Sequence, residues 1–148
     1  MLSESARRML VFRVGDERFA LPLAAVNEVI DMPAVQQLPD ASERVLGIAT
    51  LRGELVTVFD PRPLLQAGTS DTHEMALLFA VGDRRAALAI DDVFDPVLIE
   101  TDDVRPAPGV DAADSLLIGV VRRGSELIGV LDGDALARAL RLGEGEER

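Results

Sequence analysis

The chain has 148 residues, of which 48% are hydrophobic, so it is long and apolar enough for one ordinary domain or two very small ones. Its 26 acidic and 15 basic residues give a net charge of -11, which repels nucleic-acid phosphates and anionic lipids, and we expect neither as a partner. The absence of cysteine excludes disulfides and thiolate metal sites, and no apolar run approaches the roughly 18 residues of a membrane-spanning helix. We therefore expect a soluble, cytoplasmic protein without direct membrane insertion.

The first half of the chain predicts two β-hairpins and a short helix. In MLVFRVGDERFALPL, residues 9–23, β-branched and aromatic residues flank a Gly-Asp pair that tolerates turn dihedrals. In GIATLRGELVTVFD, residues 47–60, the central Arg-Gly marks a second turn between apolar strands. Asp60 before Pro61 is typical of a helix start, so we expect PRPLLQA to form a short helix.

The second half of the chain predicts the same elements again. EMALLFAVGDRRAALAI, residues 74–90, reads as a hairpin around another Gly-Asp pair, and GVVRRGSELIGVLD, residues 119–132, reads as a further hairpin. Between them, residues 100–114 are rich in proline and acid and predict an ordered loop. Asp134 is the expected cap of the helix DALARALRL, and the final GEGEER is expected to be a frayed tail.

These hairpins belong to an internal repeat. VGDERFALPLAAV, residues 14–26, aligns with VGDRRAALAIDDV, residues 81–93. GELVTVFD, residues 53–60, aligns with SELIGVLD, residues 125–132, and the two blocks recur in the same order. Each copy supplies about four or five short strands, which is the size of a small closed barrel with few exposed edges.

Four ordered blocks resemble the CheW family of chemotaxis coupling proteins. They are FALPLAAVNEVI, VLGIATLRGELVTVFDPRPLL, AALAIDDVFDPVLI followed by VRPAP, and LIGVVRRGSELIGVLDGDAL, and the resemblance covers roughly residues 8–140. It implies an all-β fold, mainly β with short helices, built as two packed five-stranded SH3-like barrels of CheW-like type. It also implies a scaffold without catalytic activity.

The resemblance also implies a division of the chain. Residues 1–148 form a single CheW-like domain, with a first subdomain of about residues 15–81. The second subdomain combines residues 8–14 with residues 82–140, and residues 141–148 form a tail. In the family the strand that opens each half pairs with the other barrel. Residues 8–14 would therefore complete the second barrel, and residues 74–81 the first.

The partners that the resemblance implies are the regulatory domain of a CheA-type histidine kinase and the cytoplasmic tip of a chemoreceptor, a methyl-accepting chemotaxis protein. The protein would be recruited to membrane-associated receptor arrays. Arg52 is the first candidate for a kinase or receptor contact, because it matches the functional surface of the family and the second copy has Gly124 in its place. Glu28 belongs to the same predicted binding set. An arginine beside a turn is, however, ordinarily only a solvated surface residue.

The remaining binding candidates are apolar. Three come from each copy of the repeat, and the resemblance implies that they line a groove between the barrels that receives the receptor's helical hairpin. Membership of the core is an equally good interpretation of each residue taken by itself. The candidates are Val26, Val29, Ile30, Val93, Val97 and Ile99.

Three departures from the family pattern leave the pathway open. The chain has Thr50 where the family has Asn, Thr57 where it has Pro, and Pro61 where it has Leu. These changes do not threaten the predicted fold. They leave room for a specialised signalling array, such as one that governs pilus motility.

No catalytic, metal or cofactor site is predicted. His73, the single histidine, is expected to be a solvated linker residue, because a metal site needs about three or four ligands. The paired aspartates lie at expected turns and caps, where they satisfy backbone donors. The alternative is an acidic small-ligand-binding barrel or an enzyme, which would require a deep pocket with converging carboxylates. The aspartates concerned are Asp91, Asp92, Asp102, Asp103, Asp132 and Asp134.

Overall fold

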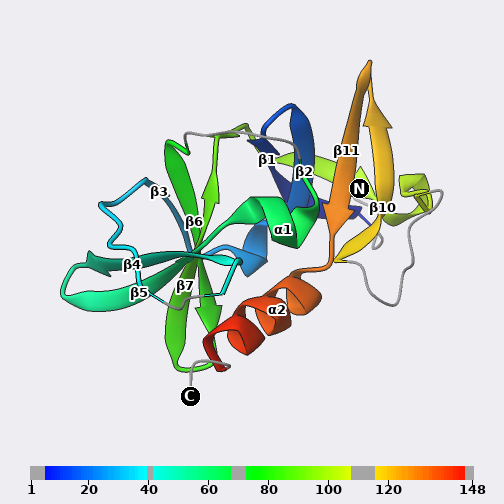
Figure 1. Ribbon diagram of the computed structural model, residues 1–148. Helices are drawn as coiled ribbons and strands as arrows, with labels where there is room; N and C mark the ends of the chain where they lie inside the picture. Colours follow the sequence, from blue (N-terminus) through cyan, green and yellow to red (C-terminus); the bar gives the residue numbers. More distant parts are fainter. Residues whose placement is uncertain (1–5, 40–41, 68–72, 108–115, 146–148) are drawn as a thin grey trace.

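The computed structural model describes residues 6–39, 42–67, 73–107 and 116–145, which form two sheets lying side by side (Figure 1). We call the first sheet barrel 1; its strand order is β3 (Glu28–Asp31), β6 (Met75–Val81), β7 (Arg84–Ile90), β5 (Glu54–Phe59) and β4 (Val45–Leu51). We call the second sheet barrel 2; its order is β10 (Leu117–Arg123), β11 (Glu126–Leu131), β2 (Glu17–Pro22) and β1 (Ala6–Val14), with β8 (Asp92–Val93) and β9 (Val97–Glu100) both paired to β1. The prediction of a mainly β fold with two packed barrels is confirmed, although barrel 2 has six strands among the described residues and not the five expected.

Each sheet is closed by an isolated bridge at a glycine. Gln36, which follows β3, pairs with Ile48 of β4, and Arg105, which follows β9, pairs with Val120 of β10. A Cβ atom on Gly47 would lie 2.2 Å from the Gln36 carbonyl oxygen. In barrel 2 the equivalent clash, at Gly119, would be with the Arg105 carbonyl oxygen at 2.4 Å. A register shift accompanies each glycine, as expected where a sheet bends to close.

The subdomain boundaries that the family resemblance implied need correction. β1 completes barrel 2 and β6 joins barrel 1, as the resemblance implied. However, β2 also lies in barrel 2, parallel to β11, and β7 lies in barrel 1, parallel to β5. A two-residue turn cannot separate strands that pair along their whole length, so each opening hairpin crosses to the other barrel as one unit. The predicted boundaries at residues 15 and 82 divided these hairpins.

The largest core is shared by the two barrels. Phe12 and Leu21 from barrel 2 pack in one cluster with Phe59 and Leu88 from barrel 1, and all four side chains are fully buried. Each barrel also has a smaller apolar cluster of its own in its interior. The shared core is the physical consequence of the exchanged hairpins, because each hairpin carries apolar residues from one copy into the other barrel.

The two α-helices follow equivalent strands. α1 (Pro61–Leu65) begins after Asp60, whose carboxylate accepts the backbone N–H of Arg62 at 3.0 Å. α2 (Gly133–Gly145) begins after Asp132, whose Oδ1 accepts the N–H of Asp134 at 3.0 Å. The predicted cap, Asp134, was therefore wrong by two residues. α2 leaves the end of β11 and contacts β6 of barrel 1, so it links the barrels (Figure 1).

The predicted tail and loop are only partly described. α2 continues to Gly145, so residues 141–145 are helical and not a frayed tail, while residues 146–148 lie outside the described part. Of the predicted loop at residues 100–114, a 3-10 turn, η2 (Thr101–Asp103), is described, and residues 108–114 are not. A second 3-10 turn, η1 (Leu23–Ala25), joins β2 to β3. Within the described residues, no helix has the length and apolarity to cross a membrane.

Candidate functional site

Arg52 occupies a strained position at the tip of barrel 1. Leu51 and Glu54 are paired, so Arg52 and Gly53 form a two-residue hairpin loop, and their φ angles are 48° and 82°. Two positive φ angles define a type I′ turn, which favours Asn or Gly at its first position. Arginine there costs about 1–2 kcal/mol of backbone energy. The aligned turn of barrel 2 has Gly124 in this place, so such a hairpin does not require an arginine there.

The Arg52 side chain contacts Glu28. Its Nη2 donates to Glu28 Oε2 at 2.5 Å, and the two side chains remain 61% and 38% exposed. Glu28 begins β3 and Arg52 follows β4, the two strands at opposite ends of the barrel 1 order. The ion pair therefore lies across the line along which barrel 1 closes. The structure brings together these two predicted residues, which are 24 positions apart in sequence.

One other ion pair is repeated between the barrels, whereas the Arg52–Glu28 pair is not. In barrel 1, Arg85 Nε lies 2.8 Å from Glu54 Oε1, and in barrel 2 the aligned Arg18 Nε lies 3.3 Å from Glu126 Oε2. Arg52 aligns with Gly124, which has a φ of 64°. The repeated pairs belong to the barrel architecture. The Arg52–Glu28 pair occurs in one copy only.

Sequence reasoning missed an exposed leucine near this tip. Leu55, in β5, is 71% exposed, and the aligned Leu127 in β11 is 50% exposed. An apolar residue inside a β-branched strand is ordinarily expected to face a core, so the sequence carries no signal that separates Leu55 from its buried neighbours. Exposed leucines at equivalent positions of the two hairpins are suited to protein contacts.

The six apolar candidates divide into two groups. Val26, Val29 and Val93 are partly buried and pack against the core shared by the barrels. Each of the other three packs within one barrel only. Ile30 packs against the interior cluster of barrel 1. Val97 packs against the interior cluster of barrel 2, and Ile99 is a buried member of that cluster. The first group fits a surface between the barrels, and the second group fits the core interpretation. Their role in binding remains a prediction.

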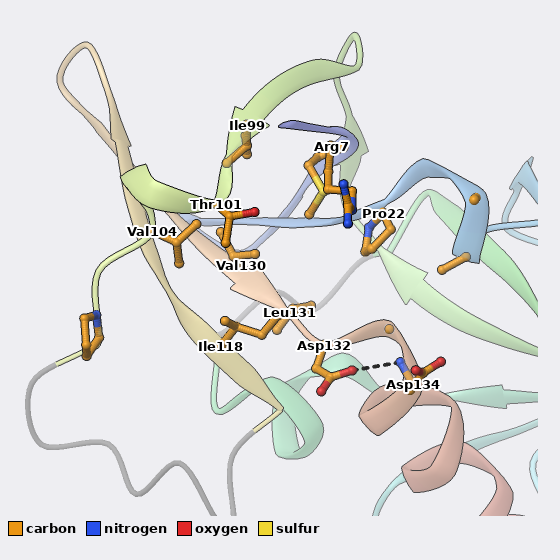
Figure 2. Close-up of a pocket in the computed structure, with 15 residues that line it drawn as sticks. Arg7, Pro22, Ile99, Thr101, Val104, Ile118, Val130, Leu131, Asp132 and Asp134 are labelled. Atoms are coloured by element: carbon orange, nitrogen blue, oxygen red, sulfur yellow. Dashed lines mark hydrogen bonds between the residues drawn. The ribbon is translucent and has the colours of Figure 1, made fainter. Parts of the chain in front are cut away.

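A pocket of about 670 Å³ opens at the end of barrel 2 (Figure 2). Its lining includes Leu131 and Gly133, which align with the larger Phe59 and Pro61 of barrel 1. Four of the lining residues are polar or charged, namely Arg7, Thr101, Asp132 and Asp134, and Asp132 Oδ1 accepts a backbone N–H at the start of α2. The pocket is therefore mostly apolar, and its two carboxylates, Asp132 and Asp134, lie where α2 begins. Its apolar wall includes Met9, Ile99, Val104, Ile118, Val130 and Leu131.

The prediction that His73 is a solvated linker residue was wrong. Its side chain is 8% exposed, and Nδ1 lies 3.0 Å from Asp91 Oδ1. The contact depends on residues 18 positions apart, which no local pattern reveals. In the part of the chain that the structure describes, no group of three or more histidine, aspartate or glutamate side chains is placed to hold a metal ion.

The carboxyl of Asp60 lies in the same buried region. Burial raises its pKa, but the hydrogen bonds and positive charge of Arg62, with a further contribution from His73, outweigh that effect and hold the pKa below 3.8. Asp60 therefore carries a stable negative charge at neutral pH. Its bonds to the backbone and guanidinium of Arg62 give it a capping role.

Two closed barrels that exchange hairpins and share a core define a class of all-β proteins with a two-barrel fold. Residues 8–141 match the model of the CheW-like domain family, so the chain belongs to the CheW family, as the sequence motifs indicated. Proteins of this family are scaffolds in chemotaxis signal transduction and not enzymes, and this chain is a CheW-like scaffold.

Individual relatives agree with the family match along most of the chain. The Chemotaxis protein CheW of Rhizobium meliloti (strain 1021) is 27% identical over 91% of this chain and 90% of its own length. Protein FrzA of Myxococcus xanthus is 32% identical over 88% of this chain and 84% of its own. The crystal structure of the scaffolding protein TtCheW from Thermoanaerobacter tengcongensis superposes with a TM-score of 0.72, covering 85% of this chain and 88% of that chain at 22% identity. The last comparison supports the fold.

Proposed function

We propose that this protein couples the cytoplasmic tip of a chemoreceptor to the regulatory domain of a CheA-type histidine kinase, in the cytoplasm and within membrane-associated receptor arrays. Membership of the CheW family supports this role, and a net charge of -11 disfavours nucleic acid as a competing partner. The protein acts as a non-catalytic connection, so it has to present separate surfaces to its two partners.

The observation that carries the proposal is Arg52. It keeps a left-handed backbone conformation that another residue would adopt at lower energy, and its ion pair with Glu28 has no counterpart in barrel 2. An exposed guanidinium held by one carboxylate keeps further donors available for a partner's carboxylates. We assign Arg52, Glu28 and the neighbouring exposed Leu55 to the kinase-binding surface. An arginine beside an apolar anchor is a common composition for a binding hot spot.

The receptor is assigned to the surface between the barrels. Val26, Val29 and Val93 come from both copies of the repeat and pack against one shared core, so they can contribute to a single apolar groove. An amphipathic helix binds such a groove through apolar residues on one face. Because the groove and the Arg52 tip use different residues, the two partners can be bound together.

Two kinds of signalling output are compatible with this coupling role. Relatives named Chemotaxis protein CheW and Protein FrzA match the chain over similar lengths. Together with Thr50, Thr57 and Pro61, which depart from the family pattern, this keeps a pilus-motility or other specialised array as an alternative output. An acidic small-ligand barrel or enzyme is less well supported, because the pocket in barrel 2 has an apolar wall and its Asp132 is engaged in capping.

The test reconstitutes purified protein, kinase and membranes that carry the receptor, after a pull-down from native cytoplasm has identified both partners. The wild-type protein is expected to raise kinase autophosphorylation only when receptor is present. Arg52→Ala should lose this effect. Arg122→Ala is the matched control, since Arg122 is exposed, lies beside the equivalent tip of barrel 2 and makes no ion pair among the described residues. Receptor-independent activation, or equal activity of both variants, would contradict the proposal.

A further inference from the structure

Asp91 marks the point where the chain crosses from barrel 1 to barrel 2. It lies between β7 and β8, and its backbone N–H donates to the Arg13 carbonyl oxygen at 2.9 Å. Its Oδ2 accepts the backbone N–H of Gly15, in the turn of the exchanged hairpin, at 2.6 Å. One residue thus joins the barrels through both its backbone and its side chain. The carboxylate is 5% exposed, so water does not compete strongly for these bonds.

His73 completes this arrangement from the other side. Nδ1 lies 3.0 Å from the second carboxylate oxygen of Asp91, and the imidazole is 8% exposed. Charged groups near this pair among the described residues include Asp60, whose pKa is lowered in part by His73, and Arg13, which donates to the Gly15 carbonyl oxygen at 2.6 Å. With one oxygen bound to Gly15 and the other to His73, the Asp91 side chain is held in a single orientation.

The repeat shows that a barrel does not require this arrangement. In the first copy Ala24 aligns with Asp91, and the crossover there is the 3-10 turn η1, closed by a backbone bond from Val26 to Leu23. The same topological step is therefore made without a carboxylate or a histidine. As with Arg52, the arrangement is present in one copy only, so the barrel topology alone does not account for it.

The residue that Asp91 positions is Val93. Asp92 pairs with Arg13 and Val93 with Phe12, so fixing Asp91 fixes the start of β8 against β1. Val93 packs on the core shared by the two barrels, where it is a candidate for the receptor groove. We infer that Asp91 and His73 are positioning residues that hold the second crossover, and through Val93 the receptor groove, in its binding geometry. This inference rests on the proposed function.

The experiment measures affinity for a receptor-tip fragment and for the kinase regulatory domain with the same set of variants. Asp91→Ala and His73→Leu should each weaken receptor binding about fivefold or more, which is the lower end of the coupling between separate sites in proteins. Both variants should leave kinase affinity within about twofold of the wild type. His73→Asn, whose amide nitrogen replaces the Nδ1 donor, should restore receptor affinity. Arg122→Ala, which changes an exposed arginine of barrel 2, is the control and should change neither affinity.

Two further measurements separate the possible failures. If Asp91→Ala does not fold, the pair His73→Leu and His73→Asn decides the question by itself. Equal losses of both affinities, or no rescue by His73→Asn, would overturn the positioning role and indicate a purely structural contact. Val26→Ala tests the groove directly. If Val26→Ala weakens receptor binding while the His73 and Asp91 variants do not, the positioning role is refuted and the proposed groove stands. If Val26→Ala has no effect on receptor binding, both the proposed groove and the positioning role are refuted.

Discussion

Replacing Arg52 by asparagine separates its structural and functional roles. Asparagine adopts the left-handed conformation more readily than arginine does, so the variant should recover about 1 kcal/mol of backbone energy. It also loses the exposed ion pair with Glu28, which contributes roughly 0.2–1 kcal/mol. The two changes nearly cancel. Arg52→Asn should therefore melt within about 2 °C of the wild type, whereas Arg52→Ala, which keeps the backbone strain, should melt up to about 4 °C lower.

Both variants should nevertheless lose kinase binding. Truncating a central arginine of an interface costs roughly 2 kcal/mol or more, which corresponds to about thirtyfold in affinity. Melting is followed by far-ultraviolet circular dichroism, because the chain has no tryptophan, and affinity by calorimetry with the kinase regulatory domain. An Arg52→Asn protein that binds the kinase as well as the wild type, or that melts more than about 6 °C lower, would refute this account of the hairpin tip.

Three further outcomes follow from the packing and from Asp60. Gly47→Ala should lower the free energy of unfolding by at least about 2 kcal/mol, because its Cβ would meet the Gln36 carbonyl oxygen; an unchanged urea midpoint would show that barrel 1 closes differently. Leu136→Ala should destabilise by about 2–5 kcal/mol in the same assay, since this fully buried side chain links α2 to the shared core, and a loss below 1 kcal/mol would contradict that packing. The lowered pKa of Asp60 stabilises the fold above pH 3.8, and this stability is lost as the pH falls through the folded-state pKa. Arg62→Ala leaves burial to raise that pKa, so acid unfolding should begin at a higher pH; an unshifted acid midpoint would count against the Arg62 contribution.

The sequence was sufficient for features that depend on neighbouring residues. Gly-Asp turns between β-branched runs predicted the hairpins, and their recurrence predicted two barrels because each copy repeats the same local chemistry. It did not reveal which barrel each hairpin enters, because that depends on parallel pairing of β2 with β11 and of β7 with β5. Those contacts join residues far apart in the chain, and alternating apolar residues satisfy either arrangement equally well.

For the candidate site, the sequence identified Arg52 as a candidate residue but did not reveal its contacts. Arg52 stood out because its aligned partner is Gly124, yet its strained φ angle and its pairing with Glu28 required the coordinates. His73 was misassigned for the same reason, since its contact with Asp91 joins two different strand connections. A lone polar residue between two periodic segments is typical of a linker, and only the tertiary fold distinguishes a buried hydrogen-bond donor from a solvated one.

An internal repeat also supplies its own control for function. Features that both barrels share, such as the closing glycines and the Arg85–Glu54 and Arg18–Glu126 pairs, are explained by the demands of a barrel. Features present in one barrel only are not explained by that demand, and two of them in the described residues are the Arg52–Glu28 pair at the tip of barrel 1 and the His73–Asp91 contact at the second crossover. An adaptor with two different partners needs such asymmetry, because two identical barrels would present the same surfaces twice and could not distinguish kinase from receptor. The unrepeated charges are therefore where substitutions should change partner choice while leaving the fold intact.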